Sequence, residues 1–163
     1  MSLSVAKLIR SIGLPLGAGL ASAALLAGCV GGPSGGGLAP GLTQAINAPG
    51  VQMDRVAALS IVNQYRAVRG AAPLAADPGL DAQAQQLASQ YAGSGTPPSK
   101  PAGVSAMRLS AGYQNFAETF SGWRNSPADA DVLASGAARR AGFAAVYNPN
   151  SAYGTHWVMV LAQ

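Results

Sequence analysis

Very few side chains in this chain could carry out catalysis or bind a metal ion. The sequence has a single histidine, His156, and a single glutamate, Glu118, and Asp129 is the third candidate. A histidine can act as the base for a serine nucleophile, and a zinc site needs at least three good protein ligands. These residues could supply three ligands at most. They define one hypothesis, a weak hydrolase with a reduced His/Glu/Asp cleft, and no other catalytic residue is assigned.

Each of the three candidates also has a structural explanation, which the sequence favours. Glu118 would be a solvated or hydrogen-bonded carboxylate on a helix face. Asp129 follows Ser126 by three residues, so its carboxylate could reach back to the amide of that helix cap and favour the positive end of the helix. His156 would be a hydrogen-bonded histidine within a strand, since no carboxylate that would orient a catalytic histidine can be identified. The sequence therefore predicts no metal and no cofactor.

The only cysteine indicates how the protein is anchored. Two basic residues, Lys7 and Arg10, lie in the first ten positions, and an uncharged apolar segment follows over residues 11–28. This pattern is typical of an export signal. Leu26-Ala27-Gly28-Cys29 resembles a bacterial lipobox, in which the cysteine thiol receives a diacylglycerol and cleavage falls just before it. We therefore expect a lipoprotein signal peptide over residues 1–28 and lipidation of Cys29. The alternative is an uncleaved membrane anchor with a chance cysteine.

The anchor also indicates a compartment and a first partner. Two or three acyl chains hold a protein stably on a membrane, whereas one chain alone is marginal. The residue after the cysteine is Val30 and not the acidic residue that signals inner-membrane retention in many Gram-negative lipoproteins. We therefore expect a bacterial envelope protein on the outer membrane, facing the periplasm. Its expected partners are the membrane, through the anchor, and a possible lipid, cell-wall or protein ligand.

Composition divides the mature chain into a tether and one domain. Residues 30–50 hold ten Gly or Pro among 21 residues and no charge, so residues 29–50 are predicted to be the lipidated cysteine and a flexible tether. The domain is predicted over residues 51–163. Without residues 1–28, eight Lys and Arg face six Asp and Glu, a net charge of +2. This near-neutral balance, with no basic run, argues against nucleic-acid binding.

Hydrophobic periodicity and cap signals predict the elements of this domain. Asp77-Pro78 and Ser126-Pro127 each place a capping side chain before a proline, which is typical of a helix start. The segment 155–162 is apolar on both faces, which favours a central strand. The predicted class is α+β, with a small antiparallel sheet of about three strands between helices. Helices are predicted over residues 53–69, from 77, over 114–124 and from 126, and strands over 104–109, 142–147 and 155–162.

Some side chains receive structural roles from this pattern. Val56, Leu59, Val62, Tyr65 and Arg69 recur at helical spacing and are predicted to form one stripe of the first helix, widened by Ile61 and Val68. Three aromatic residues are predicted to lie in the core: Phe116, Phe120 and Trp123. Arg139-Arg140 is predicted to stabilise the negative end of the short helix that follows Ser126.

Four stretches of the sequence, taken in order, carry a resemblance to a known family. They are Leu59-Ser-Ile-Val-Asn-Gln-Tyr-Arg66, Asp77-Pro-Gly-Leu80, Gly122-Trp123-Arg-Asn-Ser126-Pro127, and Gly142-Phe143 with the Trp157 strand. Together they resemble the CAP superfamily, the group of cysteine-rich secretory, antigen 5 and pathogenesis-related 1 proteins whose bacterial members are called SCP-like. The third stretch resembles the family's Trp helix, and the last resembles its closing hairpin. The resemblance implies an α-β-α sandwich with a cleft, in which many members place two His and two Glu that can bind a divalent metal.

This sequence departs from the family pattern at the metal site. The histidine that the family places two residues after the Ser-Pro is Asp129 here. The acidic residue of the first strand falls near Met107-Arg108, and no histidine stands between Tyr91 and Gly103. We therefore expect a degenerate, non-catalytic domain that serves as a binding or scaffolding module. The reduced hydrolase and a purely structural envelope lipoprotein remain the alternatives.

Overall fold

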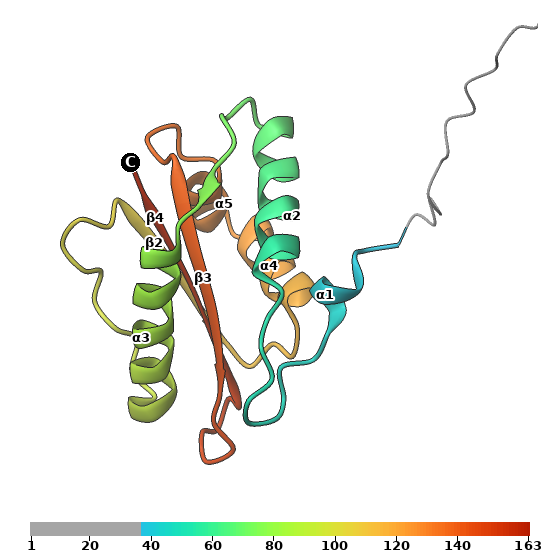
Figure 1. The fold of residues 1–163 in the computed structure, drawn as a ribbon, viewed down its shortest axis with the longest axis vertical. Coiled ribbons are helices and arrows are strands. Elements are labelled where there is room, and N and C mark those ends of the chain that lie inside the picture. Colours follow the sequence, from blue (N-terminus) through green and yellow to red (C-terminus); the bar gives the residue numbers. More distant parts are fainter. Residues whose placement is uncertain (1–36) are drawn as a thin grey trace, which may run out of the picture. The chain divides into compact units, whose positions relative to one another are not determined.

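The computed structural model describes residues 37–163, so the predicted signal peptide and Cys29 lie outside the described residues. Figure 1 shows a sheet with helices on both sides. No helix within residues 37–163 is long and apolar enough to span a bilayer. The helices are α1 (Pro40–Thr43), α2 (Arg55–Val68), α3 (Pro78–Ser94), α4 (Phe116–Asn125) and α5 (Pro127–Leu133), and the strands are β1 (Ala75–Ala76), β2 (Ala106–Ala111), β3 (Arg140–Tyr147) and β4 (Thr155–Ala162).

The sheet has four strands in the order β1-β3-β4-β2. β4 pairs antiparallel with both β2 and β3, and the two-residue strand β1 pairs parallel with β3. All eight residues of β4 are buried, which confirms the prediction of a central strand covered on both faces. β1 was not predicted from the sequence, because two residues are too few to show a periodic pattern. The α+β class with a small sheet between helices is confirmed.

The two faces of the sheet pack against different helices. On one face, Val158 and Val160 of β4 belong to a core cluster with Ala84, Leu87 and Ala88 of α3. On the other face, alternate residues of β4 pack against residues of α2, α4 and α5. Figure 1 shows this division, with α3 on one side of β3 and β4 and the other long helices opposite. Since successive side chains of a strand point to opposite faces, odd and even residues of β4 serve different layers.

α3 begins as the sequence predicts and packs closely on β3. The side chain of Asp77 accepts hydrogen bonds from the amides of Gly79 and Leu80, with Pro78 in the first turn. A Cβ on Gly142 of β3 would lie 2.1 Å from the backbone carbonyl carbon of Leu80, so only glycine permits this approach. The carboxylate of Asp81 then accepts a hydrogen bond from the amide of Phe143, 2.8 Å away.

α2 lies where the sequence predicts, but the predicted stripe was placed wrongly at its ends. Val56 and Val68 are 81% and 85% exposed. The buried stripe runs instead through Ala58, Val62 and Arg66, which are spaced by four residues along the helix. The difference arises because Arg66, a charged residue that an apolar pattern leaves out, points toward the core.

The predicted tether ends earlier than expected. Leu42 of α1 and Ile46 are only 4% and 2% exposed and belong to the core cluster of α2 and α4. The amide of Ile46 donates to the carbonyl of Gln114 at 2.8 Å, and its carbonyl accepts from the hydroxyl of Thr155. Two apolar residues four positions apart are thus enough to bring a Gly/Pro-rich segment onto the domain. The folded domain therefore begins well before residue 51.

The aromatic stripe of α4 lies in the core, as predicted. Phe116, Phe120 and Trp123 are all at most 4% exposed. The Phe116 ring lies 5.8 Å from that of Phe143 in an edge-on arrangement, which favours aromatic pairs. The indole of Trp123 donates to the carbonyl of Leu109 at 3.2 Å, so its buried N–H is satisfied and α4 is linked to β2.

Candidate functional site

An ion pair joins Asp129, where the family resemblance expects a histidine, to Arg108, which lies near the place where it expects an acidic residue. Nε of Arg108, on β2, lies 2.9 Å from Oδ1 of Asp129, on α5. Both side chains are about one-quarter to one-third exposed, at 23% and 32%. The angle at Nε does not meet hydrogen-bond geometry, so this contact is an electrostatic pairing. The guanidinium also donates to the carbonyls of Met107 and Ala128. The Asp129 carboxylate is thus already neutralised by a cation.

The predicted contact between Asp129 and the amide of Ser126 is wrong. That amide donates instead to the carbonyl of Trp123 at 3.2 Å, because α4 and α5 follow each other with Ser126 as their shared cap. The carboxylate is consequently free to turn toward Arg108 of the sheet. Asp129 still stands in the first turn of α5, where a negative charge is favourable.

Glu118 makes the contacts of a helix cap. Its carboxylate accepts from the backbone amide of Gln114 at 3.1 Å and from the side-chain amide of Asn115 at 2.8 Å. In return, the side chain of Asn115 accepts from the amide of Glu118 at 3.0 Å. This reciprocal arrangement satisfies free donors at the start of α4 in the manner of a capping box. Glu118 is engaged with its own helix end, as expected of a structural carboxylate.

His156 is fully buried on the side of the sheet that α3 covers. Its Nε2 lies 3.3 Å from the hydroxyl oxygen of Ser151, and its ring packs edge-on against Tyr91 at 4.7 Å. Within the part of the chain that the structure describes, Nδ1 has no hydrogen-bond partner. Burial lowers the pKa of the imidazole below 6.5, so the ring is neutral at neutral pH. His156 therefore has a serine neighbour that sequence reasoning did not identify.

The sheet separates His156 from the other two candidates. Ala111 of β2 is paired with His156, and Arg108 is paired with Met159, three residues further along β4 or about 10 Å. His156 faces α3, whereas Glu118 and Asp129 belong to helices whose apolar sides pack on the opposite face. A reduced His/Glu/Asp cleft requires convergence, and the structure does not bring the three together. Among residues 37–163, no three His, Cys, Asp or Glu side chains are grouped so that they could hold a metal.

Arg66 and Asn63, which belong to the segment carrying the family resemblance, hold the fold. Arg66 is fully buried and donates to the carbonyls of Ala72 at 2.8 Å and Leu133 at 2.7 Å, with further contacts to the loop after α5. The side chain of Asn63 donates to the carbonyl of Leu74 and accepts from its amide, at 3.0 and 2.8 Å. These two polar side chains satisfy backbone groups that the helix-to-strand connection would otherwise bury unpaired.

The role predicted for Arg139-Arg140 is wrong, because α5 ends at Leu133 and Arg66 supplies the cation at that end. Arg139 instead donates to the carbonyls of its own loop, at Gly136 and Ala138. Arg140 opens β3 and pairs with the carboxylate of Asp77, the cap of α3. This pairing joins the start of α3 to the edge of the sheet.

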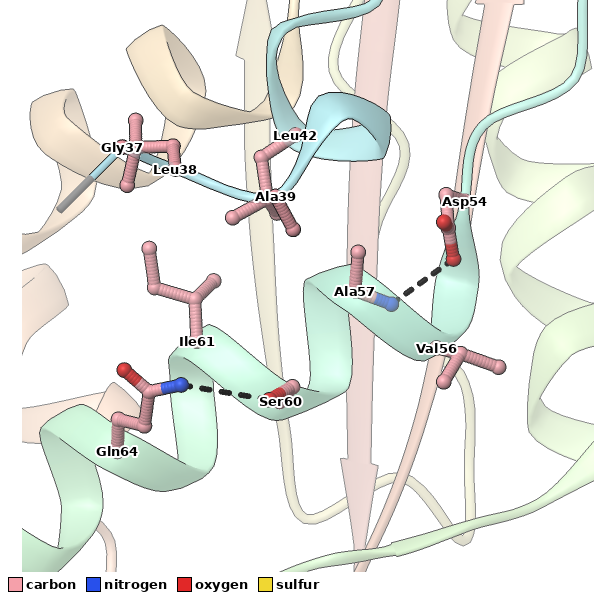
Figure 2. A pocket seen from close by; sticks show the side chains of 10 residues that line it. All are labelled: Gly37, Leu38, Ala39, Leu42, Asp54, Val56, Ala57, Ser60, Ile61 and Gln64. Atoms are coloured by element: carbon pink, nitrogen blue, oxygen red, sulfur yellow. Dashed lines mark hydrogen bonds between the residues drawn. The ribbon is translucent and has the colours of Figure 1, made fainter. Parts of the chain in front are cut away.

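Among the surface hollows formed by residues 37–163 are three that bear on the candidate residues or on the surface of α2. We call the first the apolar groove; its volume is about 320 Å³ and its lining is mostly apolar. The second, the α2 hollow of about 390 Å³, lies between residues 37–42 and α2, and Figure 2 shows its lining side chains. The third, of about 300 Å³, lies between the end of α3 and the hairpin that bears Ser151. The groove is lined by Arg55, Val56, Leu59, Ala76, Asp81, Ala141 and Phe143.

Solved structures resemble this fold at low sequence identity. MpPR-1i matches with a TM-score of 0.54 and 19% identity over 63% of this chain and 85% of that protein. An extracellular protein containing an SCP domain from Bacillus anthracis matches with a TM-score of 0.54 and 14% identity over 65% of this chain and 39% of that one. An outer surface protein from Borrelia burgdorferi matches with a TM-score of 0.50 and 15% identity over 70% of this chain and 98% of that one. This chain thus spans about two-fifths of the Bacillus protein.

No curated protein matches the chain in sequence. The model of the cysteine-rich secretory protein family, CAP, matches residues 59–161, which is more than half of the chain. The matched region covers the segments from α2 to β4, including Asn63, Arg66, Trp123 and Gly142, whose contacts hold the helices and the sheet together. The chain belongs to the CAP family of cysteine-rich secretory proteins.

Proposed function

We propose that this protein is a lipid-anchored bacterial envelope protein whose CAP domain is a non-catalytic binding module. The observation that carries the proposal is the ion pair between Arg108 and Asp129. Asp129 stands where the family resemblance expects a histidine, and Arg108 stands near the place where it expects an acidic residue. A site filled by its own cation has no free carboxylate to attract a divalent metal, and the cation itself opposes one.

The anchor part of the proposal depends on Cys29 and is tested directly in cells. In a host that processes lipoproteins, the wild-type chain should carry a mass increase of a diacylglyceryl group on Cys29 and should fractionate with membranes. Cys29→Ala should lose both the modification and the membrane association. A chain that stays in membranes with an unmodified Cys29 would contradict lipidation and support an uncleaved anchor.

The apolar groove is the surface that we propose for the ligand. Leu59, Ala141 and Phe143 supply apolar wall, and Arg55 and Asp81 stand at the rim, with Nε and Oδ1 3.7 Å apart. Most small-molecule sites combine apolar walls with a few polar groups that orient the ligand. This combination favours an amphipathic ligand with an apolar part, such as a lipid or an apolar protein side chain, over a carbohydrate polymer of the wall.

A filling substitution tests this assignment. Ala76 is exposed and lines the groove, so Ala76→Trp should close it with little effect on the core. We would titrate the mature chain carrying Cys29→Ser with 8-anilinonaphthalene-1-sulfonate, an amphipathic fluorescent probe. Ala76→Trp should weaken binding about tenfold or more, whereas Ser89→Trp on the exposed side of α3 should not. Equal binding by both variants would move the ligand site away from the groove.

A hydrolase is the second candidate, favoured by the contact between Ser151 and His156. In such a reaction the Ser151 oxygen would attack an ester carbonyl and pass its proton to Nε2 of His156. The imidazole would then return the proton to the departing alcohol as the carbon–oxygen bond breaks, which leaves the acyl group on Ser151. Water, deprotonated by the same imidazole, would then attack the acyl carbonyl, and Ser151 would leave with the proton as the carboxylic acid is released. A fluorophosphonate probe should label Ser151 under this hypothesis, and both Ser151→Ala and His156→Ala should abolish labelling. A wild-type chain that is not labelled would contradict the hydrolase, and the binding module would remain as the proposed function.

A further inference from the structure

We propose that the outer face of α2 lies against the lipid bilayer when the protein is anchored. This inference rests on the lipid anchor proposed above. The outer face of α2 consists of five exposed residues, which recur along one side of the helix: Val56, Ser60, Gln64, Ala67 and Val68.

This face has the composition expected of a surface that meets lipid. None of its five residues is charged, and its two valines are 81% and 85% exposed. They are twelve residues apart, which places them about 18 Å from each other along the helix. Leu38, 54% exposed, lies across the α2 hollow, so three of the five large apolar side chains that residues 37–163 expose gather on this side of the domain.

The start of the described chain lies beside the same face. Figure 2 shows Gly37 and Leu38 across the hollow from Ile61 and Gln64 of α2. Gly37 follows Cys29 by eight residues, and a chain of that length reaches at most about 28 Å even when fully extended. A lipidated Cys29 would therefore keep the end of the domain that bears α2 close to the headgroups. Because the tether joins the domain beside the outer face of α2, we propose the bilayer, and not another partner, as the surface that this face contacts.

Charges around the face are balanced, which predicts how it would dock. The basic residues beside it are Arg55, Arg69 and Arg124, the last of which lines a hollow together with Gln64 and Val68. The acidic residues are Asp54 at the start of α2, Asp81, 3.7 Å from Arg55, and Asp131, 3.6 Å from Arg69. Nearly equal numbers of positive and negative groups give little attraction to anionic headgroups. Docking would thus rest on shallow burial of apolar side chains, as in interfacial helices, and would depend little on salt.

The test places the chain on a membrane by chemical means. The mature form beginning at Cys29, which contains no other cysteine, is coupled through that thiol to a maleimide-bearing lipid in phosphatidylcholine nanodiscs. A doxyl-labelled lipid near the headgroups then broadens the NMR signals of methyl groups close to the bilayer. We expect several-fold larger broadening at Val56 and Val68 than at Ala102, in the exposed loop after α3, and no change in about 0.5 M salt.

A matched pair of variants completes the test. Combined Val56→Asp and Val68→Asp should reduce the broadening of the Ala67 methyl, on the same face of α2, to the level of Ala102, whereas Ser89→Asp on α3 should leave it unchanged. Equal broadening of Val56, Val68 and Ala102 in the wild-type chain would overturn the proposal and assign the face to a protein partner or to solvent. Because the coupling is chemical, this result does not depend on whether cells acylate Cys29, which the mass measurement decides separately.

Discussion

Nη1 of Arg66 donates a hydrogen bond to the carbonyl oxygen of Leu133, 2.7 Å away, although 67 positions separate the two residues in sequence. The bond places a cation at the carboxyl end of α5, where the helix leaves carbonyl groups unpaired. Arg66 is fully buried and its partners within residues 37–163 are backbone carbonyls, so no carboxylate there compensates its charge. This single side chain thus joins α2 to α5 and to the loop before β3.

Removal of Arg66 should therefore destabilise the domain strongly. Arg66→Ala leaves buried carbonyls without donors and opens a cavity, and we expect a loss of about 3 kcal/mol or more in the free energy of unfolding. Arg66→Lys should recover little, because an ammonium cannot donate in the planar pattern of a guanidinium. Urea denaturation followed by circular dichroism measures both. The exposed Arg124→Ala is the control, and an equal loss there would contradict the assignment.

The close contact of α3 with β3 predicts a glycine-specific effect. Gly142→Ala would place a Cβ 2.1 Å from the carbonyl carbon of Leu80, so backbone must shift and the domain should lose about 3 kcal/mol or fail to fold. Gly136→Ala is the matched control, since nothing lies within 4 Å of a Cβ there. The soluble yield and the urea midpoint of the two variants give the comparison. A Gly142→Ala chain as stable as the control would show that α3 sits further from the sheet.

The ion pair of Arg108 and Asp129 should contribute modestly to stability. Both side chains are partly exposed, so solvent screens the pair and a coupling of about 1 kcal/mol or less is expected. A double-mutant cycle with Arg108→Met and Asp129→Asn measures it from four urea denaturation curves. Isothermal titration of the wild-type chain with zinc accompanies the cycle and should show no binding tighter than millimolar. Tight stoichiometric zinc binding would contradict the non-catalytic proposal.

The buried His156 should make stability depend on pH. Burial lowers its folded-state pKa, whereas the unfolded chain takes up a proton at the ordinary value of about 6.5. The folded state is then favoured above about pH 6.5, and this contribution is lost progressively as the pH falls below it. The pKa of Asp77 is also lowered, chiefly by the hydrogen bond from the amide of Leu80. Its contribution to stability is lost only at pH values below the usual aspartate range, so it does not affect the measurement on His156.

Urea midpoints measured between about pH 8 and pH 5 should therefore fall for the wild-type chain. They should stay nearly constant for His156→Phe, which keeps a ring of similar shape against Tyr91 and cannot titrate. The loss of stability that Phe causes by itself cancels, because only the slope with pH is compared. A wild-type chain with a flat profile would indicate that His156 is protonated as easily in the folded state as in the unfolded one.

The packing of Ile46 predicts where the domain begins. A chain that starts at residue 51 lacks the α1 segment and should be markedly less stable than one that starts at residue 37. Ile46→Ala in the longer chain should cost about 2–5 kcal/mol, in the range for a large side chain removed from a core. Thermal unfolding of the three chains is the measurement. Equal melting temperatures of the chains starting at residues 37 and 51 would restore the predicted boundary.

The class, the order of every element except α1 and β1, and most helix and strand starts could be predicted from the sequence. Asp77-Pro78 and Ser126-Pro127 mark helix starts because a capping side chain and a proline act on the local backbone, whatever the rest of the chain does. The apolar run 155–162 likewise indicated a central strand, since a strand without a polar face must be covered twice. The segments that resemble the CAP family, from Leu59 to the Trp157 strand, indicated the fold.

Which polar groups come into contact could not be predicted from the sequence, because it depends on how the elements pack. Arg66 counts as a surface residue in any local pattern, and it is buried because carbonyls from distant loops converge on it. Ile46 sits in a Gly/Pro-rich stretch, and its burial depends on contacts with Gln114 and Thr155, which lie far along the chain. His156 and Asp129 are both plausible ligands by type, but alternate strand residues point to opposite faces, so the sheet itself keeps them apart. Contacts of this kind depend on the arrangement of the layers, which spacing along one chain does not specify.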